Sequence, residues 1–281
     1  MENLSQEKYE LNKHNHGIQI KLANDYDLAN YIEKRILKDK LSPQAVLGEI
    51  KRNNIQFKTT ICVQTLYNYI RNNVFLTLSL KHLPIASKLK KHKCKVVKSA
   101  PKGTSIELRP TIIDSRLEFG HWEMDCVESC KKSKDTLLCL TERLSRKEII
   151  LKMPCKTSAC VVDCINNLEK KYGDLFSKVF KTITVDNGVE FSNYTGLEQS
   201  CLSNNKRTTV YYCHPYSSYE RGSNERLNRE IRRWYPKGTN FSKVSVADIN
   251  KLERWLNNYP KKILNFNSSN NVFSSYLQNI C

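Results

Sequence analysis

Hydrophobic positions follow a helical period in the first part of the chain. From Tyr31 to about Asn73, apolar residues recur every three or four positions, as on one face of a helix. Ser42-Pro43 is typical of an N-cap followed by proline at the first helical position. A last short helix is expected at Val63–Arg71. Two or three short helices with tight turns indicate either a helix-turn-helix or an ordinary helical hairpin.

The last predicted helix carries polar side chains suited to DNA. Gln64, Thr65 and Asn68 are able to reach base edges or phosphates if this helix enters a groove. Arg71 adds a cation near the end of the same helix. We therefore expect these four residues to bind DNA.

After residue 107 the pattern changes to short runs typical of strands, mixed with helical segments. Residues 119–128, 135–143 and 147–153 are typical of strands joined by short links, which predicts an antiparallel meander. Residues 157–172 have helical spacing, and Gly173 follows as a typical helix stop.

A buried strand is predicted at residues 182–185, which ends abruptly in Asp186-Asn187-Gly188. A fifth strand is expected at residues 207–214. Ser223 then caps a helix that runs to Trp234, and another amphipathic helix covers residues 246–259. This order of strands and helices is that of the ribonuclease H-like α/β fold.

These patterns divide the chain into three parts. We expect a small all-α, helix-turn-helix region at residues 1–80, a basic linker at 81–107 and a ribonuclease H-like, integrase-type catalytic domain at 108–281. Between residues 81 and 102 there are eight lysines and no acid. Such a run is either a solvated linker or an arm that lies along phosphates.

The net charge indicates the kind of partner. The 46 Lys and Arg residues outnumber the 28 Asp and Glu residues, which leaves +18. An excess of this size favours a polyanion, with nucleic acid first and an anionic membrane surface second; a merely soluble basic protein is the third possibility. A transmembrane helix is not expected, because no run of about 18 apolar residues is present.

The 11 cysteines do not predict disulfides or zinc. The chain opens on polar residues without the pattern of a signal peptide, and no CxxC pair occurs. Cys62, Cys139, Cys164 and Cys213 lie singly in apolar segments, as reduced core cysteines do.

Three acids are candidates for a metal centre. Asp125 lies near the middle of the first predicted strand, Asp186 at the end of the fourth, and Glu225 in the first turn of the helix after the fifth. If the two strands are adjacent, their carboxylates repel, and a divalent cation resolves the conflict. Oxygen ligands favour Mg²⁺ or Mn²⁺, and two such ions promote in-line phosphoryl displacement.

Neighbouring acids compete for these roles. Glu128 and Glu190 lie close in sequence, and Glu123 shares a strand face with Asp125, so spacing alone leaves the choice open. Cations around the same helix are candidates for phosphate contacts, although a solvated basic face is an equally good interpretation of each. They are Arg221, Arg229, Arg232, Arg233 and Lys237.

Several linked motifs resemble one family. Residues 120–125 (GHWEMD), 182–191 (TITVDNGVEF) and 215–225 (PYSSYERGSNE) are similar to segments of the DDE transposases of the insertion-sequence-thirty family. Residues 232–239 and 256–264 resemble the segments that follow. The resemblance covers roughly residues 110–270, and Ser42-Pro43 with residues 65–70 extends it into the helical region.

This resemblance implies a retroviral-integrase-like core and Mg²⁺-dependent strand transfer between double-stranded DNA ends and a target. It assigns catalysis and metal binding to Asp125, Asp186 and Glu225, and so selects Asp125 over Glu123. It also implies a homo-oligomer on DNA, recognition of terminal inverted repeats, and a cytoplasmic, nucleoid-associated bacterial protein.

The chain departs from the family pattern in two places. Members usually begin with another helix-turn-helix, so we expect an N-terminally truncated chain. Arg226 follows Glu225 where asparagine is more common. The alternatives are therefore a truncated or inactive copy that acts as a DNA-binding regulator or inhibitor, and a general ribonuclease H-like nuclease.

Overall fold

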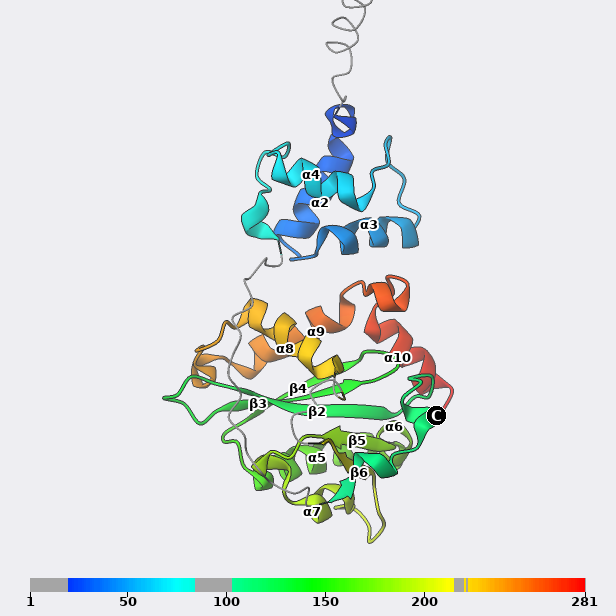
Figure 1. Cartoon of the computed structure of the whole chain (residues 1–281), viewed down its shortest axis with the longest axis vertical. Helices are drawn as coiled ribbons and strands as arrows, with labels where there is room; N and C mark the ends of the chain where they lie inside the picture. Colours follow the sequence, from blue (N-terminus) through cyan, green and yellow to red (C-terminus); the bar gives the residue numbers. More distant parts are fainter. Residues whose placement is uncertain (1–19, 84–102, 215–219, 221, 281) are drawn as a thin grey trace, which may run out of the picture. The chain divides into compact units, whose positions relative to one another are not determined.

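The structure, a computed structural model, describes residues 20–83, 103–214, 220 and 222–280. The chain separates into two compact units, residues 1–87 and 88–281 (Figure 1). Most of the expected basic linker falls on residues 84–102 and lies outside the described residues.

The first unit is helical, as the pattern predicts. Its helices are α2 (Tyr26–Leu37), α3 (Pro43–Arg52) and α4 (Val63–Arg71). The predicted cap is present, because the Ser42 side chain accepts a hydrogen bond from the backbone N–H of Ala45 at 3.2 Å. The expectation that Cys62 is a core residue is wrong. Its thiol is exposed and caps α4, because Cys62 stands at the N-cap position.

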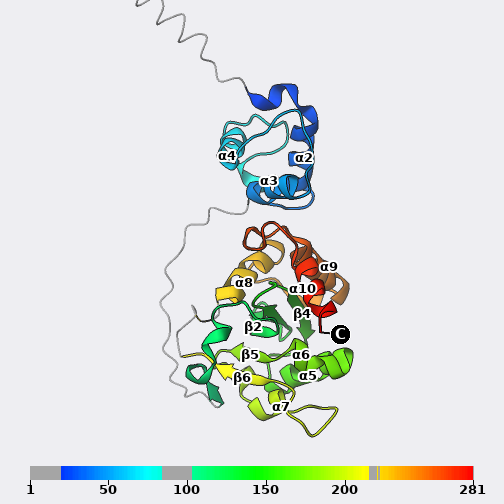
Figure 2. The same cartoon turned by 90° about the vertical axis from the view of Figure 1, so that its right-hand side faces the viewer.

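The second unit is built on one mixed sheet (Figures 1 and 2). Its strands are β1 (Thr104–Ser105), β2 (His121–Glu128), β3 (Thr136–Glu142), β4 (Glu148–Met153), β5 (Thr182–Val185) and β6 (Thr209–Tyr212). Its helices are α5 (Ser158–Tyr172), α6 (Phe176–Val179), α7 (Tyr194–Glu198), α8 (Gly222–Trp234), α9 (Val246–Asn258) and α10 (Ser269–Gln278).

The strand order is β1-β6-β5-β2-β3-β4. Strands β2, β3 and β4 pair antiparallel, which confirms the predicted meander. Strand β5 lies parallel to β2 on the other side, and β6 lies parallel to β5. The predicted adjacency of the first and fourth strands of the ribonuclease H-like order is therefore present. The two-residue strand β1 was not predicted, because it is too short to show a period.

Helices cover both faces of the sheet (Figures 1 and 2). On one face α5 packs over a core that includes Trp122, Met124 and Val185. On the other face α8 and α9 pack over Val127 and Cys139. The predicted apolar stripe of α8 is mostly buried, with Leu227 and Ile231 in the core and Trp234 partly buried against it. This second face also carries the predicted acids.

Candidate active site

The pairing of β2 with β5 brings two of the predicted acids side by side. The strands run parallel, with Trp122 opposite Ile183 and Glu123 opposite Thr184. If this register is continued two positions beyond Glu123 and Thr184, Asp125 lies opposite Asp186. Because side chains alternate along a strand, both carboxylates point to the face covered by α8.

The turn after β5 fixes the Asp186 carboxylate. Its Oδ1 accepts a hydrogen bond from the backbone N–H of Gly188 at 3.0 Å, which is an Asx turn. The Asn187 side chain donates to the carbonyl oxygen of Cys213 at 2.8 Å and ties the turn to the end of β6. A Cβ atom on Gly188 would lie 2.5 Å from Glu190 Oε2 and 2.9 Å from Asp186 Oδ1. A side chain at this position would therefore displace the Glu190 or the Asp186 carboxylate.

Helix α8 holds the Asp125 carboxylate. Asn228 donates from Nδ2 to Asp125 Oδ2 at 3.0 Å, and the backbone N–H of Cys126 donates to Oδ1 at 2.9 Å. Glu225 lies three residues before Asn228, so both side chains share one face of the helix. The Glu225 side chain is exposed, and among the described residues it has no hydrogen-bond partner.

The three predicted acids are thus not equally placed. Asp125 and Asp186 are neighbours across β2 and β5, and Glu225 lies one helical turn from the asparagine that binds Asp125. Within the described ranges, no three His, Cys, Asp or Glu side chains lie close enough together to hold a metal ion. The site residues therefore remain a prediction.

Negative charge is concentrated between these strands. Burial, followed by the nearby carboxylates of Glu190 and Asp125, raises the pKa of the Cys126 thiol, and Asp186 adds to the effect. The thiol consequently stays protonated at neutral pH. The charge of Lys156, which pairs with Glu190, opposes the effect of these carboxylates.

The competing acids have structural partners. Glu123 is fully buried; its Oε2 accepts the backbone N–H groups of Ser223 at 3.0 Å and Asn224 at 3.2 Å, and its Oε1 lies 3.2 Å from Arg143. Lys156 pairs with both Glu128, at 2.7 Å, and Glu190, at 3.1 Å. Glu123 therefore anchors the start of α8.

The expectation that Ser223 caps α8 is wrong. Ser223 lies inside the first turn, and its hydroxyl accepts a hydrogen bond from Arg146 Nη1 at 2.7 Å. The first N–H groups of a helix have no acceptor within the helix, and here those of Ser223 and Asn224 donate to the carboxylate of Glu123. Strand alternation predicts only that Glu123 faces the same side of the sheet as Asp125.

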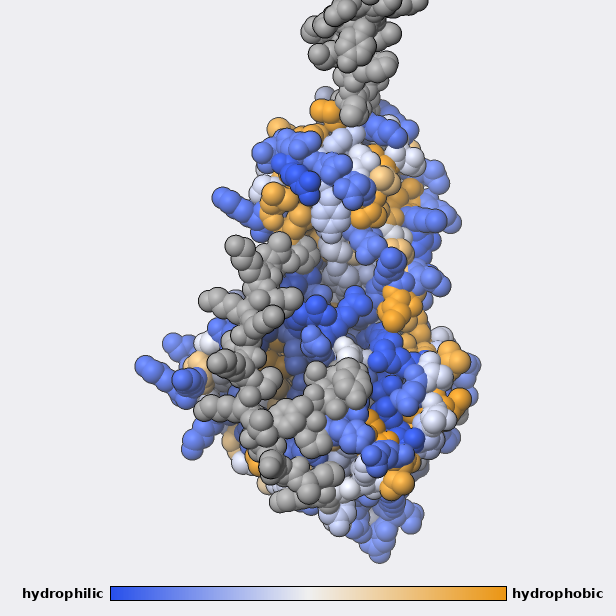
Figure 3. Space-filling view, viewed as in Figure 1, coloured by the Kyte–Doolittle hydropathy of each residue, from blue (hydrophilic) through white to orange (hydrophobic). Residues whose placement is uncertain are grey.

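The cations predicted to contact phosphates differ in their surroundings. Arg229 and Lys237 are exposed. Arg232 donates to the carbonyl oxygen of Glu128 at 2.9 Å, and Arg233 pairs with Glu230 at 2.7 Å and stacks over Trp255. Arg221 lies outside the described residues. The surface over α8 is strongly hydrophilic in Figure 3.

In the helical unit, three of the four predicted DNA contacts share one exposed face. Gln64, Asn68 and Arg71 are exposed at helical spacing on α4, and Gln64 donates to Asn68 at 3.2 Å. Thr65 is half-buried, and its backbone N–H donates to the Cys62 thiol at 3.4 Å. These contacts with DNA remain a prediction.

Comparison with known proteins gives relatives of one kind, although no protein-family model matches the chain. The chain is 32% identical over 212 residues to the probable transposase for insertion-like sequence element IS1161 of Streptococcus salivarius, across 75% of this chain and 58% of the relative. It is 32% identical over 246 residues to transposase InsI for insertion sequence element IS30C of Escherichia coli K12, across 84% and 62%.

A third relative is covered more fully. The chain is 33% identical over 242 residues to a putative integrase, ORF3, of Spiroplasma virus SpV1-R8A2 B, across 82% of this chain and 68% of the relative. Among solved structures, the catalytic core domain of BIV integrase is similar with a TM-score of 0.43 and 18% identity, across 58% of this chain and 98% of that core.

The chain spans 58% to 62% of the length of the two transposases above. None of the helices in the described ranges has the length and apolar character needed to cross a membrane. From the identity and coverage of these relatives, the chain belongs to the insertion-sequence-thirty (IS30) family of transposases.

Proposed function

We propose that this protein is a metal-dependent DNA transposase that cleaves the ends of an insertion sequence and joins them to target DNA. The observation that carries the proposal is that Asp125 lies on β2 and Asp186 directly follows the adjacent strand β5, on the side of the sheet where α8 bears Glu225. Relatives named as transposases and as an integrase support the reaction class.

The donor set fits a hard divalent cation. Asp125, Asp186 and Glu225 offer only carboxylate oxygens, which suit Mg²⁺ or Mn²⁺ better than zinc. Bound in this place, two such ions would lower the pKa of the attacking water or 3′-hydroxyl and stabilise the leaving oxygen. The exposed Glu225 carboxylate is available to complete a ligand set that the two aspartates begin.

The protein's own contribution is to hold the carboxylates in place. The Asx turn at Gly188 orients Asp186, and Asn228 orients Asp125. Glu123 fixes the start of α8 against the sheet, which sets the position of Glu225. Rigid support of this kind limits reorganisation during the reaction.

The partner in this proposal is double-stranded DNA, both as element ends and as target. The net charge of +18 favours a polyanion. The exposed face of α4 and the cations on α8 are the proposed contact surfaces, and joining two ends calls for a homo-oligomer on DNA.

The test replaces Asp186 with asparagine, which keeps the shape and removes the charge. Asp186→Asn should abolish Mg²⁺-dependent cleavage and strand transfer of end-bearing DNA while DNA binding persists. Asp163→Asn, at an exposed site on α5, is the matched control and should behave as the unchanged protein. Cleavage by Asp186→Asn at the original rate would remove this carboxylate from the site.

A second candidate is a DNA-binding regulator without catalytic activity. The observation that favours it is the exposed row of Gln64, Asn68 and Arg71 on α4, which needs no metal to contact DNA. The two functions separate in a strand-transfer assay with Mg²⁺ and end-bearing DNA. Binding without cleavage supports the regulator, and cleavage without joining supports a general nuclease.

A further inference from the structure

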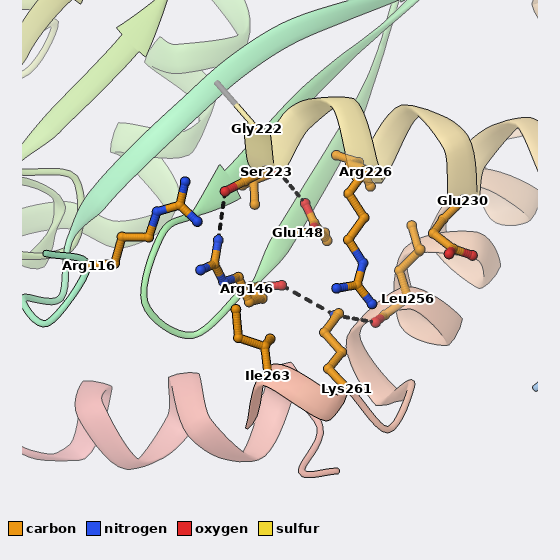
Figure 4. Close-up of a pocket in the computed structure, with 12 residues that line it drawn as sticks. Arg116, Arg146, Glu148, Gly222, Ser223, Arg226, Glu230, Leu256, Lys261 and Ile263 are labelled. Atoms are coloured by element: carbon orange, nitrogen blue, oxygen red, sulfur yellow. Dashed lines mark hydrogen bonds between the residues drawn. The ribbon is translucent and has the colours of Figure 1, made fainter. Parts of the chain in front are cut away.

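A basic cavity lies beside the start of α8, and Gly222, Ser223 and Arg226 of this helix line it. It has a volume of about 220 Å³ and is walled by Leu227 and Leu256 as well as by charged side chains. Figure 4 shows the side chains of Arg116, Arg146 and Arg226 directed into this space from three different segments. None of these arginines belongs to the acidic site.

Two of the three guanidinium groups lack a partner. Among the residues that the structure describes, neither Arg116 nor Arg226 makes a side-chain hydrogen bond or ion pair. Arg146 donates from Nη1 to Ser223 Oγ at 2.7 Å, and its buried Nε has no hydrogen-bond partner there. The guanidinium groups of Arg116 and Arg226 are therefore available to donate hydrogen bonds to a ligand.

Two acids, Glu148 and Glu230, also line the cavity, and both have other partners. Glu148 is buried and accepts a hydrogen bond from Thr141 at 2.7 Å, with the buried Lys261 as its neighbouring cation. Glu230 pairs with Arg233 at 2.7 Å. Lys261 and Arg146 both favour the charged form of Glu148, and Arg233 pairs with Glu230, so among the described residues Arg116 and Arg226 are left without a carboxylate partner.

The cations also repel one another. Burial, followed by the charge of Arg116, lowers the pKa of Arg146 to about 10. Burial lowers the pKa of Lys261 to about 8; the charge of Arg226 lowers it further, while Glu148 opposes the shift. A bound anion would relieve this repulsion, so the electrostatics agree with the geometry.

The backbone conformation of Arg116 and Arg146 also supports a functional role for the cavity. Arg116 has φ 57° and Arg146 has φ 59°, both in the left-handed region that disfavours side chains with a Cβ. Turns that need this conformation usually carry Gly or Asn. Strained residues that persist are held by their surroundings and tend to mark functional sites. Here both strained residues deliver a guanidinium to one cavity.

We propose that this cavity binds a phosphate group of a DNA strand, with Arg116, Arg146 and Arg226 contacting its oxygens. Guanidinium groups bind phosphate oxygens in pairs and remain charged at any physiological pH. The inference rests on the proposed function, because it takes DNA to be the polyanion. The first turn of α8 would then offer Glu225 to the reaction on one side and Arg226 to the strand on the other.

The test measures binding of the full chain to a labelled DNA duplex in EDTA, over a series of KCl concentrations. Arg116→Gln combined with Arg226→Gln should reduce the slope of log K against log[KCl] by about 0.9, the value for one phosphate contact. Arg226→Gln alone should reduce the slope by less, because the remaining arginines would keep part of the contact with the same phosphate. Arg226→Lys should keep most of the slope.

Arg254→Gln is the matched control, since Arg254 is exposed on α9 and does not line the cavity. Unchanged tryptophan fluorescence and melting temperature would show that the variants fold. Slopes for Arg116→Gln and Arg226→Gln equal to that of Arg254→Gln would overturn the proposal. A second result would also overturn it. If inorganic phosphate raises the melting temperature of the protein, and Arg226→Gln abolishes this rise but leaves the salt slope of DNA binding unchanged, the cavity takes free phosphate.

Because EDTA removes the metal, this experiment is independent of catalysis. A reduced slope in a protein that never cleaves DNA would support the cavity and reject the transposase. Mg²⁺-dependent cleavage with unchanged slopes would reject the cavity and leave the transposase standing.

Discussion

The two sides of the first turn of α8 carry opposite charge. On one side Glu225 shares a helix face with Asn228, which binds Asp125. On the other side Arg226 lines the cavity with Arg116 and Arg146. A single helical turn thus separates an acidic site suited to a cation from a basic cavity suited to an anion.

Glu123 differs from Glu225 and Arg226 in its burial and in its partners. Glu123 is fully buried and anchored by Arg143 and two backbone N–H groups. Glu225 and Arg226 are exposed, and neither has a hydrogen-bond partner among the described residues. The first kind of charge holds the fold, and the second kind is available to a ligand.

The largest expected effect tests the acidic side. Glu225→Gln should reduce Mg²⁺-dependent cleavage by roughly a thousandfold, because a preorganised interaction with the transition state is lost. DNA binding in EDTA should not weaken, since a negative charge is removed. Arg226→Gln is the counterpart and should weaken DNA binding. Equal losses of binding in both variants would contradict the division between the two sides.

The next largest effect concerns stability and distinguishes Glu123 from Asp125 on β2. Glu123→Gln should destabilise the second unit by about 3 kcal/mol, because the buried Arg143 would keep only its longer ion pair, at 3.5 Å, with Asp114 and the start of α8 would lose a charged acceptor. Asp125→Asn should cost about 1 kcal/mol, since one hydrogen bond to Asn228 is weakened. Urea unfolding followed by tryptophan fluorescence measures both, because the three tryptophans, Trp122, Trp234 and Trp255, lie in this unit. Equal destabilisation would mean that Asp125 is also structural.

A smaller effect is expected at the turn that orients Asp186. Gly188→Ala should slow cleavage about tenfold, because the added Cβ displaces the Asp186 or Glu190 carboxylate and small misplacements of reacting groups are costly. Val189→Ala is the control, because Val189 is 79% exposed in the same turn. A cleavage rate for Gly188→Ala that matches this control would show that the turn tolerates the extra atom.

The smallest expected effect lies in the helical unit and concerns a neutral side chain. Gln64→Ala should weaken DNA binding about fivefold, near the lower limit for a contact with a base edge. The salt slope should not change, in contrast to Arg226→Gln, because no charge is removed. Gln56→Ala, exposed outside the helices, is the control. A binding constant for Gln64→Ala equal to that of Gln56→Ala would place the DNA contact elsewhere.

Much of the second unit follows from local patterns. Short apolar runs between turn residues predict β2 to β6 within a few residues of their observed bounds, and Gly173 ends α5 as expected. Asp186-Asn187-Gly188 forms a turn because an aspartate side chain can bond the backbone two residues later. These features depend on neighbours in sequence and are therefore readable from it.

The partners of charged residues were not predictable in the same way. Glu123 binds Arg143, 20 residues away, and the start of α8, 100 residues away. Strand alternation gives the face on which Glu123 lies, but it cannot say which helix end will arrive there. The sequence also left open what Arg226 does beside Glu225.

The sequence by itself determined the order of strands and helices, the excess of positive charge and the three candidate acids. It could do so because periodicity, turn chemistry and composition are local properties. Only the tertiary structure decided that Glu123 is an anchor and that Arg226 faces a cavity with Arg116 and Arg146. Those roles arise where distant segments meet, and the packing of α8 on the sheet sets which charges find partners and which are left for a ligand.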